Sequence, residues 1–253
     1  MKKAILAFLL FSLISLSYGQ FIVYQPEILG GSFNYNLIYN QEFYYPAEAI
    51  QAQAEGEVKV SFLVEKNGFA SGFQVLNSVY PSLDRAYIDV LKHILWVPGT
   101  SDGVVSDIRI TKSAKFKIKK YQKLVKKRAY DQPPFPFTPF DSSLTIIDYK
   151  KLEQLSQAFY NGKEVNINKF ISEYIKVPAA AAKQDIKGIV ELEFVIEPSG
   201  RLSNFKEIVG AGGGCTEEAI RLMQMLQWQP GMLHGDYVRS NYYIKVNFGH
   251  TKY

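Results

Sequence analysis

The chain repeats itself at a fixed distance, and this repeat limits what the chain can fold into. Residues that recur 132 positions later are Pro46, Gly56, Gly68, Phe73, Trp96, Pro98, Gly99 and Phe116, which return as Pro178, Gly188, Gly200, Phe205, Trp228, Pro230, Gly231 and Phe248. Solenoid repeats are shorter, about 20 to 50 residues. A distance of 132 residues in a chain of 253 therefore predicts two copies of one domain.

Both copies show the same order of hydrophobic patterns. After Gly56 and after Gly188, apolar and polar residues alternate, which predicts a strand with one buried face. A short turn and a second strand follow, at residues 71–77 and 202–209, so each pair of strands should form an antiparallel hairpin. Apolar residues at helical spacing come next, and a Trp-x-Pro-Gly sequence ends that helix before a last alternating strand.

These patterns predict an α+β fold with two copies of a small domain. Each copy is expected to be a three-stranded antiparallel sheet packed with two helices, the first of them at residues 46–53 or 178–183. The expected divisions are a signal peptide at residues 1–19, a first domain at 20–120, a basic and Pro-rich linker at 121–160 and a second domain at 161–253. Prolines between residues 133 and 139 favour an extended spacer of roughly 20 Å, and a short helix is expected at residues 152–159.

The first residues have the features of an export signal. Lys2 and Lys3 precede an apolar run at residues 4–16, and Ser-Tyr-Gly at residues 17–19 offers a cleavage site before Gln20. The apolar run is shorter than the roughly 20 residues that a membrane-spanning helix needs. We expect a cleaved signal peptide and an exported mature chain. The alternative is an uncleaved segment that keeps the chain at the membrane.

Positive charge is concentrated in one segment, from Lys112 to Arg128. Residues 112–128 contain nine basic and no acidic residues, whereas the rest of the chain after residue 19 contains 18 basic and 24 acidic residues. Because the basicity is local, it does not indicate a nucleic-acid-binding protein. The alternation around Lys115 favours the solvated face of a strand. The alternative is contact with an anionic surface, such as membrane headgroups or cell-wall polymers.

The glycine-rich stretch at residues 209–219, VGAGGGCTEEA, is interpreted as a tight turn and not as a phosphate loop. Cys215 stands where a G-x-G-x-x-G pattern needs glycine, and Glu217 and Glu218 would repel phosphate from the first turn of the following helix. Thr216 is the expected N-cap of that helix.

Catalytic chemistry has no support in the sequence. Cys215 is the one cysteine, so no internal disulfide can form, and a partly buried thiol is favoured over a nucleophile because no histidine stands in a catalytic context. Neither a catalytic carboxylate pair nor a metal-ligand spacing is evident. We expect no enzymatic activity, no cofactor and no metal.

The order and spacing of the repeated motifs identify a family. The first copy reads YPAEAIQAQAEGEVKVSFLVEKNG followed by LWVPG, and the second reads IKVPAAAAKQDIKGIVELEFVIEPSG followed by LQWQPG and YYIKVNF. Both resemble the C-terminal domain of TonB, the periplasmic end of an energy transducer of Gram-negative bacteria. The motif residues are Tyr45, Pro46, Gly56, Trp96, Pro98 and Gly99 in the first copy, and Pro178, Gly188, Trp228, Pro230 and Gly231 in the second. Val177 stands where the family usually has tyrosine.

The resemblance implies a binding mode and a periplasmic location. In the family, the last strand is a sheet edge that accepts a short extended segment of an outer-membrane receptor, the TonB box, by strand addition. Carried over, the pairing strands are residues 108–118 and 239–248. Arg239 is expected among the residues of the partner-binding strands, and the outward positions are expected at Lys115, Lys117, Tyr243, Lys245 and Asn247. The alternative is that these side chains form ordinary solvated faces of edge strands, where lysine discourages aggregation.

The expected function is that of a periplasmic, non-enzymatic binding protein. Its partners would be outer-membrane receptors or other envelope proteins, and it would support or modulate TonB-dependent transport. A full transducer also has an anchor helix and a long Pro-rich rod, so coupling to an ion-driven motor is not expected here. The alternative is a structural adaptor of the envelope that binds the cell wall through residues 112–128.

Overall fold

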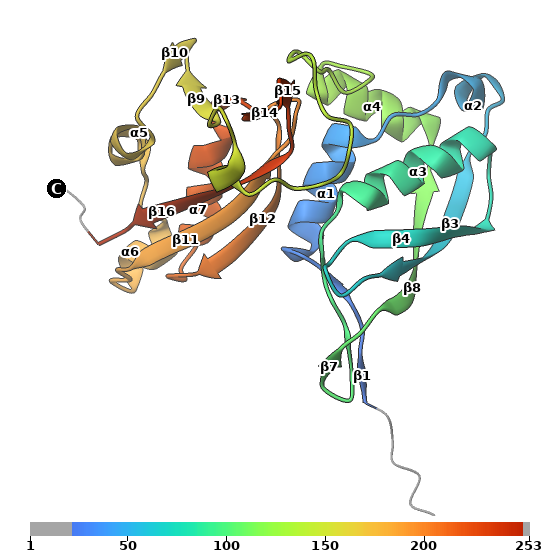
Figure 1. Cartoon of the computed structure of the whole chain (residues 1–253), viewed down its shortest axis with the longest axis horizontal. Coiled ribbons are helices and arrows are strands. Elements are labelled where there is room, and N and C mark those ends of the chain that lie inside the picture. Colours follow the sequence, from blue (N-terminus) through green and yellow to red (C-terminus); the bar gives the residue numbers. More distant parts are fainter. Residues whose placement is uncertain (1–21, 250–253) are drawn as a thin grey trace, which may run out of the picture.

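The computed structural model describes residues 22–249, which form two similar units side by side (Figure 1). The sheet of the first unit has the strand order β4-β3-β8, and that of the second has the order β12-β11-β16. Their bounds are β3 (Gly56–Val64), β4 (Ala70–Asn77), β8 (Ile108–Phe116), β11 (Ile189–Ile196), β12 (Leu202–Val209) and β16 (Ser240–Asn247). All pairs are antiparallel, which confirms the predicted α+β class and its three-stranded sheets. The predicted signal peptide lies outside the described residues.

Two helices pack on each sheet, at the places the repeat predicts. They are α2 (Ala47–Gln51) and α3 (Pro81–His93) in the first unit, and α6 (Ala179–Lys183) and α7 (Cys215–Gln224) in the second. The apolar stripe of α3 includes Leu83 and Leu91, and that of α7 includes Leu222 and Met223; all four side chains are fully buried. Each unit therefore has its own hydrophobic core.

The repeat extends to irregularities of the backbone. The pairing of β3 with β4 shifts register between Lys59 and Val60 and again between Ser61 and Leu63. The pairing of β11 with β12 shifts at the corresponding places, residues 191–192 and 193–195. Gly72 and Asn204, which also correspond, both have positive φ, at 58° and 50°. The register shifts and the positive φ mark a β-bulge at the same place in each copy, so the two copies share a bulge as well as a strand order.

The recurring glycines Gly68 and Gly200 are required by the backbone that passes over them. They lie in the turns between the first two strands, with φ of 82° and 79°. A Cβ atom would lie 2.5 Å from the carbonyl oxygen of Trp96 in the first unit and 2.3 Å from that of Trp228 in the second. Only glycine fits, because both the positive φ and the close carbonyl exclude a side chain.

Short strands surround the two sheets. They are β1 (Val23–Tyr24), β2 (Glu27–Ile28), β5 (Trp96–Val97), β6 (Thr100–Ser101) and β7 (Val104–Val105) in the first unit, and β9 (Gln157–Tyr160), β10 (Lys163–Glu164), β13 (Gln227–Gln229), β14 (Met232–Leu233) and β15 (Asp236–Tyr237) in the second. The helix predicted at residues 152–159 is not present. The 3-10 helix η1 (Tyr149–Lys151) ends just before this range, and β9, which pairs antiparallel with β13 and buries Ala158, occupies its end. The second unit also contains α5 (Ile167–Tyr174).

Helix α4 (Ile118–Arg128) follows β8 and belongs to the first unit. Its apolar side places Ile118 and Tyr121 in the first core, at 8% and 5% exposure. Strand β8 therefore ends at Phe116 and not at residue 118, because Lys117 is already the N-cap of α4. The lysines of residues 119–127 lie on the opposite, exposed side of this helix.

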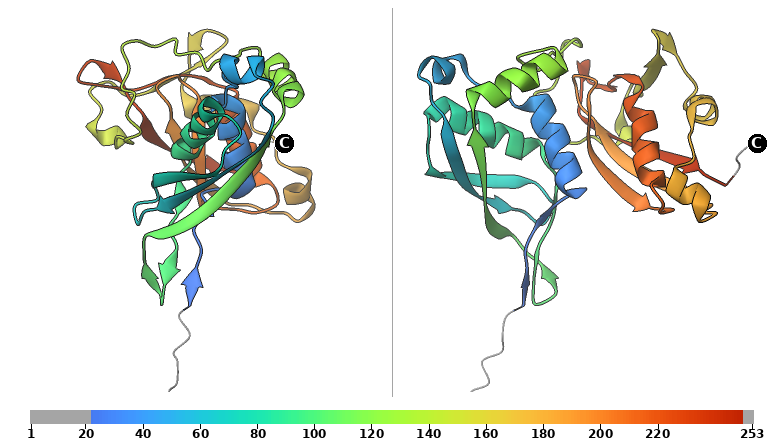
Figure 2. Two further views of the ribbon diagram at one scale, coloured as in Figure 1. Left: turned by 90° about the vertical axis from the view of Figure 1, so that its right-hand side faces the viewer. Right: turned by 180° about the vertical axis from the view of Figure 1, so that it is seen from behind.

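Helix α1 (Gly31–Glu42), which the hydrophobic pattern does not predict, lies between the two units (Figures 1 and 2). Ile38 on one side is fully buried in the first core, whereas Leu37 packs on the second core. Glu42 at its end forms an ion pair with Arg201 of the second unit, with Nε–Oε1 at 3.0 Å. The helix therefore joins the two units.

Buried polar groups hold the units together at a second place. The side-chain amide of Asn204 accepts a hydrogen bond from the Leu95 backbone N–H at 2.7 Å and donates one to the His93 carbonyl oxygen at 2.9 Å. The Arg239 guanidinium donates to the same carbonyl at 2.9 Å. Because His93 is the last residue of α3 and Leu95 follows it closely, the end of that helix is fixed to the second sheet.

The Pro-rich linker packs on the second unit. Arg201 donates a hydrogen bond to the Pro134 carbonyl oxygen at 2.9 Å, and its guanidinium lies over the Phe135 ring. Phe140 forms an isolated bridge with Tyr237. The linker is therefore not a free extended spacer. No helix within residues 22–249 is long and apolar enough to cross a membrane.

Candidate functional site

The last strand of each unit is the edge of its sheet, and in β16 the direction of its backbone groups is known. Phe248 donates its N–H to the Gly188 carbonyl at 2.8 Å, so even-numbered residues of this strand pair with β11. In an antiparallel pair such residues alternate with residues whose N–H and C=O point away. The backbone groups of Asn241, Tyr243 and Lys245, with Asn247, therefore point to the outer edge.

The same odd-numbered residues carry the side chains on the solvent face of β16. The Tyr243 hydroxyl donates to Glu193 Oε1 at 2.6 Å, and Lys245 Nζ lies 2.6 Å from Glu191 Oε1. The hydrogen bond to Glu193, with partial burial, raises the pKa of Tyr243 to about 12. Asn247 is exposed and accepts a hydrogen bond from the Gly249 N–H. These three residues lie where the sequence places them.

Strand β8 repeats this arrangement. Its register with β3 pairs Gly56 with Phe116, just as Gly188 is hydrogen-bonded to Phe248 in the second unit. By that equivalence Thr111, Ser113 and Lys115 direct their backbone groups outward, and their side chains are exposed. Of these only Lys115 is among the residues expected to face outward, although the alternation of the strand places Thr111 and Ser113 on the same face.

A groove of about 460 Å³ opens beside the C-terminal end of β8. Its aromatic lining comes from α1, the segment after it and α4, and its charged lining from the lysines around the start of α4. These residues are Tyr35, Tyr39, Phe43, Tyr45 and Tyr121, with Lys115, Lys117 and Lys120. Burial raises the pKa of Tyr39 well above its usual range, so this tyrosine is neutral at physiological pH. The groove thus offers apolar contact and positive charge next to unpaired backbone.

Two cavities flank the outer edge of β16. One of about 570 Å³ lies on the side of Tyr242 and Ile244 and is lined on its other side by the segment around Val165. The other, of about 220 Å³, lies between Tyr149, Leu155 and Tyr243. A strand placed against this edge would therefore find room for side chains on both of its faces.

Two of the residues expected in the partner-binding strands lie elsewhere. Arg239 precedes β16 and is 2% exposed; its guanidinium is paired with the buried Glu197 at 3.1 Å, so its side chain is not available to a partner. The physical reason is that a buried carboxylate and the His93 carbonyl need its donors. Lys117 is exposed but lies beyond β8, at the start of α4.

The family motif residues occupy structural positions. Trp96 and Trp228 are each 3% exposed, and Trp228 Nε1 donates to the Met223 carbonyl at 3.1 Å. The glycines that follow allow close passage of another segment: a Cβ on Gly99 would lie 2.4 Å from the Tyr24 carbonyl oxygen, and one on Gly231 would lie 2.5 Å from a Leu152 methyl group. The remaining motif residues lie at the ends of elements: Tyr45 and Pro46 precede α2, Gly56 opens β3, Pro178 precedes α6, Gly188 precedes β11, and Pro98 and Pro230 follow β5 and β13.

The glycines of the turn before α7 are explained by the conformation of the backbone. Gly212, Gly213 and Gly214 all have positive φ, and Gly214, not Thr216, is the N-cap of α7. The Glu218 carboxylate already accepts the Lys176 N–H at 2.7 Å and pairs with Arg221 at 2.6 Å. A negative charge thus occupies the helix start, which disfavours an added phosphate.

Cys215 is fully buried at the start of α7, and burial, with a smaller contribution from Glu217, raises the pKa of its thiol. Because the thiolate is the reactive form, a disulfide reagent at pH 8 is expected to label the folded protein at least about 100-fold more slowly than the protein in 8 M urea. Stopped-flow labelling with a chromogenic disulfide would measure both rates. Equal rates would mean that the thiol is accessible in the folded protein.

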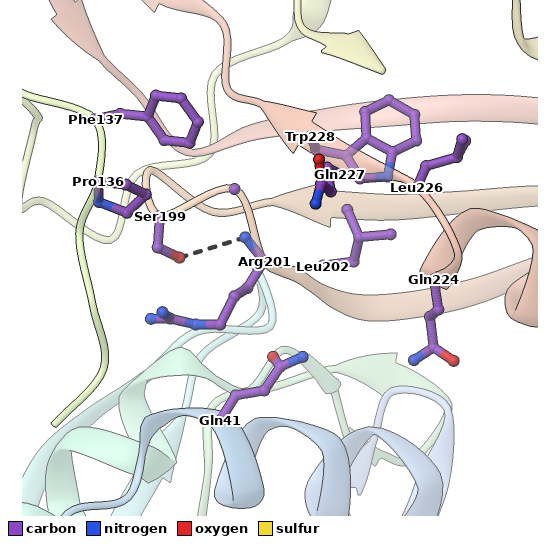
Figure 3. A pocket seen from close by; sticks show the side chains of 11 residues that line it. Gln41, Pro136, Phe137, Ser199, Arg201, Leu202, Gln224, Leu226, Gln227 and Trp228 are labelled. Atoms are coloured by element: carbon purple, nitrogen blue, oxygen red, sulfur yellow. Dashed lines mark hydrogen bonds between the residues drawn. The ribbon is translucent and has the colours of Figure 1, made fainter. Parts of the chain in front are cut away.

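A cavity of about 580 Å³ lies between α1, the linker and the second unit (Figure 3). Gln41 of α1 faces it from one side and Phe137 of the linker from another, while Trp228 and Leu202 line the second unit. Arg201 is the charged residue of the lining, and its guanidinium is bound by Glu42. The lining contains no acid, histidine or cysteine that could transfer a proton or bind a metal, and no cluster of three such residues occurs within residues 22–249.

Comparison with known proteins identifies the family. The family described as Gram-negative bacterial TonB protein C-terminal matches residues 41–118 and again residues 173–249. A solved structure, the solution NMR structure of the Pseudomonas aeruginosa TonB CTD, shares 33% sequence identity over 29% of this chain and 76% of its own, with a TM-score of 0.25. The search of curated proteins found no match. Because the two family matches together cover more than half of the sequence, the chain belongs to the TonB C-terminal family and contains two tandem copies of its domain.

Proposed function

We propose that this protein is a periplasmic, non-enzymatic binding protein that takes extended segments of outer-membrane receptors, of the TonB-box kind, by strand addition. One observation carries the proposal: in each unit the last strand is a sheet edge with outward backbone groups. Within residues 22–249 no backbone partner meets the outward groups of Ser113 in β8 or of Tyr243 and Lys245 in β16. An added strand supplies those partners. Such binding would support or modulate TonB-dependent transport.

The groove beside β8 defines which segments suit the first unit. A strand added to this edge would alternate its side chains between the two faces of the sheet. On one face they would meet Tyr39 and Phe43, and near the end of the strand they would meet Lys115 and Lys120. Segments with alternating apolar residues and an acidic residue would therefore bind best, because both contacts are then satisfied.

The test uses proline at outward backbone positions, where the sheet itself loses no hydrogen bond. Ser113→Pro and Lys245→Pro are expected to leave the fold intact and to weaken binding at their own edge about tenfold or more, because the added strand loses one backbone partner and meets the proline ring. Isothermal titration of residues 20–253 with TonB-box peptides from receptors of the same organism measures affinity and stoichiometry. Ser113→Ala and Lys245→Ala are the matched controls.

The controls separate backbone pairing from side-chain contacts. Ser113 also donates to Glu57 and Lys245 pairs with Glu191, so the alanine variants report the loss of those contacts alone. Circular dichroism and thermal unfolding establish that each variant is folded. If proline and alanine variants bind alike, pairing with these edges is not the mode of binding. If the unchanged protein binds no peptide, receptor binding itself is contradicted.

The exposed side of α4 favours a second function, that of an envelope adaptor. No ion pair within residues 22–249 involves Lys119, Lys120, Lys123, Lys126 or Lys127. Uncompensated cations on one helix face attract anionic polymers at low salt. Co-sedimentation with isolated cell wall, repeated after changing these lysines to glutamine, would separate this function from peptide binding.

A further inference from the structure

The outer edge of β16 is already paired in part by the chain itself. Ile147, in the linker, forms an isolated parallel bridge with Ser240. Its N–H donates to the Arg239 carbonyl at 2.8 Å, and its carbonyl accepts the Asn241 N–H at 3.2 Å. These are the two backbone bonds that a parallel added strand makes around one residue.

The chain leaves this edge directly after Ile147. Asp148 accepts the Lys150 N–H at 3.0 Å and so caps the 3-10 helix η1, which turns the chain away. The Tyr149 N–H is bound by the side-chain oxygen of Asn241 at 2.9 Å, and its ring lies 5.7 Å from that of Tyr243. The linker therefore covers the edge as far as Asn241 and leaves the rest of β16 open.

We propose that residues 145–148, Thr-Ile-Ile-Asp, are an internal ligand of β16, which a partner segment must displace. The inference rests on the proposed function, because it requires that this edge accepts extended segments. It also defines the partner by chemistry: an extended segment with β-branched apolar residues followed by an acid, running parallel to β16.

The geometry makes the internal ligand displaceable. It pairs through one residue, and Thr145 and Asp148 on either side of the Ile146–Ile147 pair are exposed. A partner in the same place could continue along Tyr243, Lys245 and Asn247, whose outward groups the linker does not reach. A longer partner strand thus forms several backbone hydrogen bonds in place of the two that Ile147 forms.

The two units differ in this respect. Within residues 22–249, the outer edge of β8 has no bridge to another segment. The first unit thus presents an open edge and the second a covered one, although their sheets are alike. A covered site binds its partner more weakly, by the fraction of molecules in which the cover is released.

The experiment compares Ile147→Pro, which lacks the N–H that binds Arg239, with Ile147→Val, which keeps it. Both are made in residues 20–253 carrying Ser113→Pro, so that peptide binding at β8 is suppressed. The first measurement is hydrogen exchange by NMR, which requires no ligand. The Asn241 amide is expected to exchange at least about tenfold faster in Ile147→Pro than in Ile147→Val. Free exchange of this amide in the unchanged protein would overturn the internal pairing.

The second measurement is a titration with a synthetic peptide of residues 141–150, DSSLTIIDYK. It is expected to bind Ile147→Pro at least about tenfold more tightly than Ile147→Val. A second variant, in which Gly-Ser-Gly-Ser replaces residues 145–148, should bind the peptide as tightly as Ile147→Pro does. It takes the place of Ile147→Pro in the comparison if that variant does not fold. Equal affinity for open and covered variants, or no binding to either open variant, would overturn the inference.

Titration of the same variants with receptor peptides distinguishes failure of the proposed function from failure of this inference. If DSSLTIIDYK binds the open variants but receptor peptides bind none, the internal ligand is supported and the receptor function is contradicted. If receptor peptides bind all variants with one affinity, the receptor function stands and the internal ligand is overturned.

Discussion

Replacing Arg239 by methionine is expected to destabilise the protein by about 3–5 kcal/mol, because it leaves a buried charge without its partner. The side chains of Arg239 and Glu197 are 1% and 6% exposed, and they form an ion pair at 3.1 Å. The guanidinium also donates to the carbonyl oxygens of Leu144 and His93, so three acceptors lose their donor together. Urea unfolding followed by tryptophan fluorescence measures the loss, since Trp96 and Trp228 report on separate units.

The double variant Arg239→Met with Glu197→Gln is the matched control. It removes the unpaired carboxylate and should recover part of the stability, since the cost of breaking a buried pair resides largely in the charge left behind. A single variant within about 1 kcal/mol of the unchanged protein, which is the usual range of exposed pairs, would show that this pair is not buried in solution.

Replacing Gly200 by alanine is expected to cost about 2–5 kcal/mol, which combines backbone strain at positive φ with overpacking. The new Cβ would lie 2.3 Å from the Trp228 carbonyl oxygen and 3.0 Å from the Phe137 ring. Gly235 provides the comparison, because its φ of 86° is similar but no atom lies within 4 Å of its Cβ position. Gly235→Ala should cost only about 1–2 kcal/mol, the strain alone.

The difference between the two glycine variants is the informative quantity. Thermal and urea unfolding of both, under one set of conditions, gives it directly. Equal losses would mean that the carbonyl of Trp228 moves aside freely, and the recurrence of glycine at positions 68 and 200 would then reflect φ alone.

The sequence was sufficient to predict the sheets because their pattern is local. Alternation after Gly56 and Gly188 marks strands with one buried face, and the short turns require antiparallel pairing. The alternation also predicts that Tyr243, Lys245 and Asn247 share a solvent face, as they do. That these residues bind a partner remains a proposal.

The contacts between units could not be predicted, because they join residues that are far apart in sequence. Helix α1 has no clear apolar stripe, since it packs on two cores from opposite sides. The sequence pattern predicts that Arg239 starts an exposed strand, and only the fold brings Glu197 and His93 to it. Ile147 sits in a linker whose prolines suggest an extended spacer, and nothing in its neighbourhood indicates a strand partner about 90 residues later.

The hydrogen bonds of Asn34 limit how copies of this protein can associate. Its fully buried amide donates to the Phe205 carbonyl at 2.7 Å and accepts the Phe205 N–H at 3.0 Å, as a neighbouring peptide group would. The far side of the second sheet is thereby terminated by a side chain of the same molecule. Growth of the sheet by further copies, which leads to fibres, is blocked in that direction. Under the proposed function one edge of this sheet binds a partner, and the Asn34 contact keeps the opposite edge from pairing with further copies.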